Sequence, residues 1–154
     1  MGDLDYDNAM RNYEQEVQRS RHLDNKSNTQ IGFIGIILAL IGTIYFDLGM
    51  GVKQTINMWF IGTGIGVLLI SMGITIIVIT PFYKSMPVLN VGKFYNKYKN
   101  YDETAKKEFL TKIYIRLANN LVSSNNKKAM ILFYSAALSL IGLATTFLAF
   151  IVKS

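Results

Sequence analysis

Residues 58–80 read MWFIGTGIGVLLISMGITIIVIT, a run of 23 residues without a charged side chain. At 1.5 Å per residue a helix of this length is about 34 Å long, and the hydrocarbon core of a bilayer is about 30 Å thick. The run is too long, and alternates too little, for a strand of a membrane β-barrel. It therefore predicts a transmembrane helix.

The distribution of charge extends this interpretation to the whole chain. Three stretches, 27–46, 54–83 and 129–152, contain no Asp, Glu, Lys or Arg and together hold 74 of the 154 residues. All 26 charged residues lie in the other 80. A soluble domain mixes apolar and charged residues at the period of a helix or a strand. Segregation into blocks instead predicts an integral membrane protein.

We expect an all-α integral membrane protein with three transmembrane helices and cytoplasmic amphipathic helices. The sequence divides into an N-terminal amphipathic helix at 1–30, a transmembrane hairpin at 31–80 with spans at about 31–47 and 58–80, a cytoplasmic helical loop at 81–128, and a third transmembrane helix at 129–154.

The orientation follows from the basic residues. Of the 16 Lys and Arg residues, 14 lie before the first span or in the loop at 81–128. Loops rich in Lys and Arg stay on the cytoplasmic side. The N-terminus and this loop are therefore predicted to be cytoplasmic and the C-terminus outside, in a multi-pass protein of the cell (inner) membrane.

Small residues recur at steps of three and four along each predicted span. Small side chains let helix backbones approach closely in lipid, where no hydrophobic force drives helices together. Either the three helices of one chain pack through these residues, or some of the small faces serve contacts between subunits. The predicted packing and assembly positions are Gly35, Ala39, Gly42, Gly62, Gly66, Gly73, Ser135, Ser139 and Gly142.

Two charged segments are predicted to be helical. Apolar residues spaced by three and four favour a helix at 5–26 that runs into the first span. In the loop, Phe94, Tyr95 and Tyr98 alternate with lysines, which is typical of a helix on the membrane surface and also of packing against other cytoplasmic helices. Nucleic-acid binding is not expected, because no known binding fold accompanies this pattern.

The last predicted cytoplasmic helix begins after Asp102, a plausible N-cap. The stretch 123–128, SSNNKK, either breaks this helix or lies within one that continues into the third span. In the second case Lys127 and Lys128 reach the membrane interface with their long side chains.

No catalytic arrangement is recognisable. The chain has no Cys and one His, and it lacks a P-loop, a dinucleotide-binding glycine motif and an HExxH motif. We therefore expect no enzyme activity, no cofactor and no metal site.

Several short features occur in a familiar order between about residues 20 and 152. They are Asp24, Lys26 and Ser27 before the first span, Pro81 after the second, Phe94 and Tyr95, then Glu108, Phe109, Ile113 and Tyr114, and finally Lys127 or Lys128 with Gly142. This set resembles the Pycsar effector transmembrane domain (PycTM) and, more loosely, SLATT-type membrane effectors. The chain departs from that pattern at Thr80, where an Arg is expected before the proline, and contains no cyclic-nucleotide-binding domain.

The resemblance implies an antiviral module that assembles in the inner membrane and compromises it when a cyclic pyrimidine nucleotide is sensed. Our first hypothesis is accordingly a small, self-associating protein that contacts membrane lipid and perturbs or permeabilises the membrane. The alternative is a structural or accessory subunit of a larger membrane complex, with other membrane subunits as partners.

Overall fold

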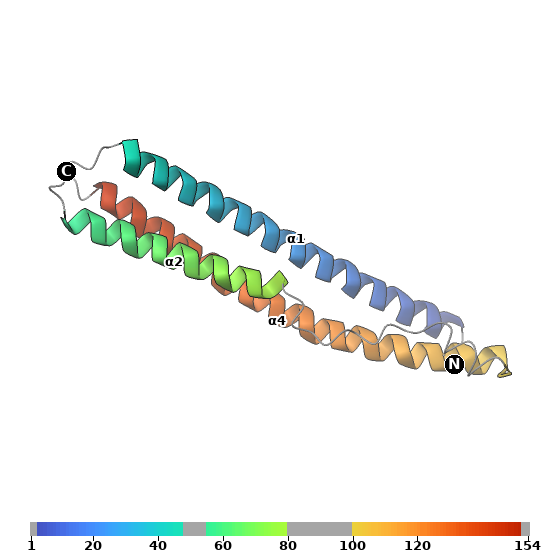
Figure 1. The fold of residues 1–154 in the computed structure, drawn as a ribbon. Coiled ribbons are helices and arrows are strands. Elements are labelled where there is room, and N and C mark those ends of the chain that lie inside the picture. Colours follow the sequence, from blue (N-terminus) through green and yellow to red (C-terminus); the bar gives the residue numbers. More distant parts are fainter. Residues whose placement is uncertain (1–2, 48–54, 80–99, 152–154) are drawn as a thin grey trace. The chain divides into compact units, whose positions relative to one another are not determined.

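The computed structural model describes residues 3–47, 55–79 and 100–151, and these residues are almost entirely helical. Helix α1 runs from Asp3–Asp47, α2 from Thr55–Ile79 and α4 from Glu103–Ile151 (Figure 1). All three helices are long and apolar enough to cross a membrane. The prediction of an all-helical chain with three candidate membrane spans is confirmed.

Helices α1 and α4 each continue from a charged segment into an apolar one. No Gly or Pro interrupts α1 before Gly32 or α4 before Gly142. These are the residues that most strongly disfavour a helix interior. The stretch 123–128 is helical throughout, so of the two alternatives it is the continuous helix that forms. The first turn of α4 is extended by the Lys106 N–H, which donates to the Asp102 carbonyl at 3.1 Å.

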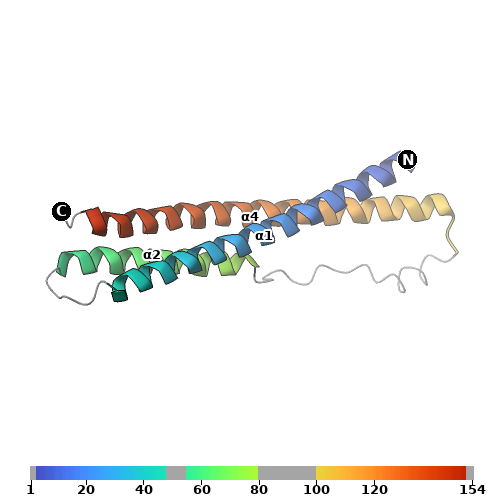
Figure 2. The same ribbon diagram turned by 90° about the horizontal axis from the view of Figure 1, so that it is seen from above.

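The chain forms two compact units, which are described separately. Unit 1 comprises Met1–Leu23 and Pro81–Lys127, and unit 2 comprises Asp24–Thr80 and Lys128–Ser154. Within unit 2, α2 runs antiparallel to the C-terminal part of α4, and the two lie side by side in both views (Figures 1 and 2).

The apolar core of unit 2 is small. Ile34 and Ile41 of α1 and Leu68 of α2 are buried together. Many larger apolar side chains point outward instead, and Phe33, Ile36, Leu40, Leu69, Ile70, Phe133, Leu140 and Ile141 are all exposed. An apolar exterior of this extent is unusual for a protein surrounded by water.

Unit 1 is organised around aromatic contacts. The Tyr114 ring of α4 lies 5.9 Å from the Tyr6 ring and 5.6 Å from the Tyr13 ring, centroid to centroid. Both α1 tyrosines therefore contact the same α4 ring. Ala9 and Ala118 are also buried in this unit, and their short side chains allow a close approach of the helices.

Candidate functional site

The centre of unit 2 is a cluster of hydroxyl groups, which we call the hydroxyl cluster: Ser71 and Thr75 of α2 with Ser135 and Ser139 of α4. Ser71, Thr75 and Ser135 are 0% exposed. The Ser71 hydroxyl donates to the Ser135 carbonyl at 2.7 Å, and the Ser135 hydroxyl donates to the Ser71 carbonyl at 2.8 Å. The Thr75 Oγ1 lies 2.6 Å from the Ser135 Oγ, and the Ser139 Oγ lies 2.7 Å from the Ser71 Oγ.

Helix α1 joins the hydroxyl cluster through one amide. Gln30 Nε2 donates to the Ser135 Oγ at 2.9 Å and lies 3.4 Å from the Ser139 Oγ. One polar cluster therefore connects all three helices of unit 2. Polar groups that pair with one another in this way can hold helices together where hydrophobic burial contributes little.

Helices α2 and α4 approach each other closely at Gly64 and Gly142. A Cβ atom at Gly64 would lie 2.9 Å from the Gly142 carbonyl oxygen, and one at Gly142 would lie 3.0 Å from the Leu68 Cγ. A larger residue at Gly64 would force the two helices to shift, and one at Gly142 would require its neighbours on α2 to give way slightly. The Thr146 hydroxyl donates to the Gly142 carbonyl at 2.8 Å and is buried at the same crossing.

The pattern of small residues predicted Gly142 as a packing position but not Gly64. On the second span, the prediction followed the pair Gly62 and Gly66 instead. The available signal was the spacing of Gly64, Ser71 and Thr75, which places these small and hydroxyl residues on one side of α2 together with Leu68. Gln30 was missed because a single amide at the end of a span has no periodic pattern.

Most of the other predicted packing positions are open in this structure. A Cβ atom at Gly35, Gly42, Gly62, Gly66 or Gly73 would meet nothing within 4 Å, and Ala39 is exposed. Ser135, Ser139 and Gly142 are instead buried within unit 2.

The open glycines of α2 share one side of the helix. At about 100° per residue, Gly62, Gly66 and Gly73 fall within roughly 40° of one another. Gly64 and Ser71 lie on the opposite side and pack against α4. We call Gly62, Gly66 and Gly73 the glycine face of α2. The described residues of unit 2 place nothing within 4 Å of a Cβ atom on this face.

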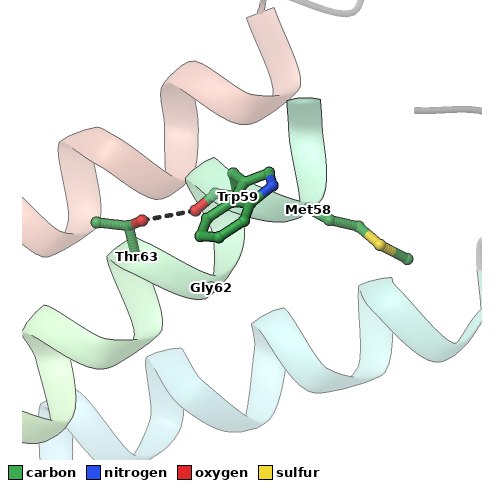
Figure 3. A pocket seen from close by; sticks show the side chains of 4 residues that line it. All are labelled: Met58, Trp59, Gly62 and Thr63. Carbon is green, nitrogen blue, oxygen red and sulfur yellow. Dashed lines mark hydrogen bonds between the residues drawn. The ribbon is translucent and has the colours of Figure 1, made fainter. Parts of the chain in front are cut away.

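A shallow pocket of about 530 Å³ adjoins the glycine face at the start of α2, lined by Met58, Trp59, Gly62 and Thr63 (Figure 3). The Thr63 hydroxyl donates to the Trp59 carbonyl at 2.7 Å, so it is satisfied within its own helix. Trp59 is 74% exposed. Tryptophan at the end of an apolar helix is typical of a side chain at a membrane–water interface.

The residues that were predicted to lie at the membrane interface have different surroundings. Lys128 is half-buried, and its Nζ lies 2.7 Å from the Asp24 Oδ1, so it forms an ion pair within unit 2. Lys127 is exposed. Phe94, Tyr95 and Tyr98 lie outside the described residues.

The described residues contain no candidate metal centre, and the comparisons with known proteins give no relative. In the part of the chain that the structure describes, no three His, Asp or Glu side chains lie close enough to hold a metal ion. Comparison with protein-family models, with curated proteins and with solved structures finds no match. The class of protein is therefore defined by the fold and by nothing else: it is an all-helical protein with three helices long and apolar enough to span a membrane.

Proposed function

We propose that this chain is a multi-pass protein of the inner membrane that self-associates and thereby perturbs or permeabilises the bilayer, the role implied by its resemblance to PycTM-type effectors. The N-terminal segment and the segment at 81–128 face the cytoplasm, and the C-terminus lies outside. The basic residues concentrated in those two segments support this orientation.

The single observation that carries the proposal is the uncovered glycine face of α2. A Cβ atom at Gly62, Gly66 or Gly73 would meet nothing within 4 Å among the described residues, while the opposite side of the same helix is packed tightly at Gly64. Glycines on a lipid-facing surface forgo the contacts that a larger side chain would make there. Their use is explained if a helix of another copy packs closely against them.

Activity is tested by producing the full chain in bacterial cells and following membrane potential with a voltage-sensitive dye. We expect depolarisation and slowed growth that increase with the amount of protein. Unchanged potential and growth at high levels of membrane-inserted protein would refute the proposed activity.

Assembly is tested with the double variant G62L/G66L. Leucines at both positions should shift the chain from a homo-oligomer to a monomer in mild detergent and should abolish depolarisation, because the helices can no longer approach closely. The matched control is A144L, which adds the same side chain at an exposed position of α4.

Three outcomes would contradict this proposal. The first would be that the double variant keeps its oligomer size. The second would be that the control variant disrupts the oligomer equally. The third would be that the purified protein carries foreign membrane subunits in a fixed ratio. The last result would favour an accessory subunit of a larger complex.

A further inference from the structure

One side of α1 in unit 2 combines an unpaired lysine with exposed apolar side chains. Lys26, Phe33 and Leu40 follow one another at intervals of seven residues, so they lie within roughly 40° of one another around the helix. Phe33 is 56% exposed and Leu40 is 57% exposed, and Lys26 is exposed as well. We call these three residues the lysine face of α1.

The charge of Lys26 is not balanced within this part of unit 2. The described residues near Lys26 in unit 2 include two further charged side chains, Asp24 and Lys128. The Lys128 Nζ lies 2.7 Å from the Asp24 Oδ1, so these two groups neutralise each other. Lys26 itself has no ion pair among the described residues. Its ammonium group is therefore available to an anion.

The length of the lysine face matches one leaflet of a bilayer. Leu40 follows Lys26 by 14 residues, which is about 21 Å along the helix. A bilayer with its headgroups is about 40–45 Å thick, so one leaflet measures about 21 Å. A phospholipid whose phosphate pairs with Lys26 can therefore lay an acyl chain along Phe33 and Leu40. A small soluble anion would leave both apolar side chains without a partner.

Charge selects the class of phospholipid. Phosphatidylcholine carries an ammonium group close to its phosphate, and this group already balances the phosphate charge. Phosphatidylglycerol carries the phosphate without a cation. A single lysine near a membrane surface favours anionic lipid by a free energy that corresponds to about fivefold in affinity. The unbalanced charge of Lys26 therefore favours an anionic phospholipid over a zwitterionic one.

We propose that the lysine face of α1 binds one anionic phospholipid, with the lipid phosphate on the Lys26 Nζ and an acyl chain along Phe33 and Leu40. The inference rests on the proposed membrane location of unit 2. It does not depend on the proposed self-association or on depolarisation of the membrane.

The test uses the full chain in nonionic detergent with equal amounts of dioleoyl-phosphatidylglycerol and dioleoyl-phosphatidylcholine, which have the same acyl chains. Native mass spectrometry counts the lipids that the protein retains, and we expect about fivefold more phosphatidylglycerol. Insertion is checked separately by washing membranes of the producing cells at high pH. Extraction of the chain by this wash would overturn both the membrane location and the lipid site. Equal retention of the two lipids by a chain that resists extraction would overturn the lipid site alone.

Lys26→Gln should lower the retention of phosphatidylglycerol about fivefold, to the level of phosphatidylcholine. Its control is Arg11→Gln, which removes one positive charge from an exposed position in the charged segment of the same helix and should leave retention unchanged. Equal losses in both variants would mean that net charge alone attracts the lipid, and would overturn the proposal. A change in oligomer size by Lys26→Gln with unchanged lipid retention would show that another copy covers this face, and would also overturn it.

A second pair of variants tests the apolar part of the lysine face. Phe33→Ala keeps Lys26 but removes the ring that contacts the acyl chain, so it should also lower the retention of phosphatidylglycerol. The control is Phe133→Ala on α4, where the ring is 71% exposed but the residue seven positions earlier is Asn126 and not a lysine. Unchanged retention in Phe33→Ala, or an equal loss in Phe133→Ala, would overturn the assignment.

Discussion

The two units differ in the side chains that lie at their centres and on their outer positions. Unit 2 buries hydroxyl groups at its centre and turns its large apolar side chains outward. Unit 1 packs tyrosine rings against one another and carries amides and charged groups on its outer positions. Hydrophobic burial drives helices together in water but contributes little in lipid, where packing and hydrogen bonds hold them together. The contrast therefore supports the proposal that unit 2 lies in lipid and unit 1 in water.

The substitution with the largest expected effect lies where α2 and α4 approach closely in unit 2. Gly64→Leu should lower the free energy of unfolding by about 3 kcal/mol, because the new side chain overlaps the backbone of α4 at Gly142. Thermal unfolding in detergent, followed by circular dichroism, measures this. Ala144→Leu is the control, since it adds a leucine at an exposed position of α4 that lies outside both this crossing and the glycine face. Equal losses in both variants would show that the crossing of α2 and α4 does not determine stability.

An intermediate effect is expected from the aromatic centre of unit 1. Tyr114→Ala should cost about 2 kcal/mol, because it removes two ring contacts together with half-buried apolar area. Hydrogen exchange by mass spectrometry should show faster exchange within 103–122 and unchanged exchange within 58–79. Leu4→Ala, at a side chain that is 76% exposed, is the control. Faster exchange in both segments would mean that the units do not unfold separately.

The smallest effect is expected from the hydroxyl cluster. Ser71→Ala should cost about 1 kcal/mol, the magnitude measured for hydrogen bonds between membrane helices. Unfolding in detergent with increasing SDS measures the change. Thr63→Ala is the control, because its hydroxyl bonds only within α2. A loss as large as that of Gly64→Leu would mean that hydrogen bonds, rather than close packing, dominate unit 2.

The three long helices could be predicted from the sequence because blocks of apolar residues and the scarcity of Gly and Pro are local properties. The contacts that hold the helices together were less predictable. The pair Gly62 and Gly66 and the pair Gly64 and Leu68 are equally regular patterns on α2, and periodicity alone does not say which side meets α4. That choice depends on which side aligns with Ser135 and Ser139 across the bundle, a property of two helices together.

The hydrogen bond from the Asn125 Nδ2 to the Glu16 Oε2 in unit 1 was unpredictable for a related reason. The two residues are 109 positions apart, and the contact depends on two helices meeting in one register. The sequence separated the charged segments from the apolar ones, but no spacing within either segment marks this pair.

The hydroxyl cluster also has a consequence for entropy. Its four hydroxyl groups carry four hydrogens, but they make seven contacts of 3.0 Å or less with one another and with the Ser71 and Ser135 carbonyls. The hydrogens can therefore be distributed among these contacts in more than one way without moving a heavy atom, as in ice. A network with this residual proton disorder tolerates the loss of one member, because the remaining hydroxyls rotate to new acceptors while the helices stay in place.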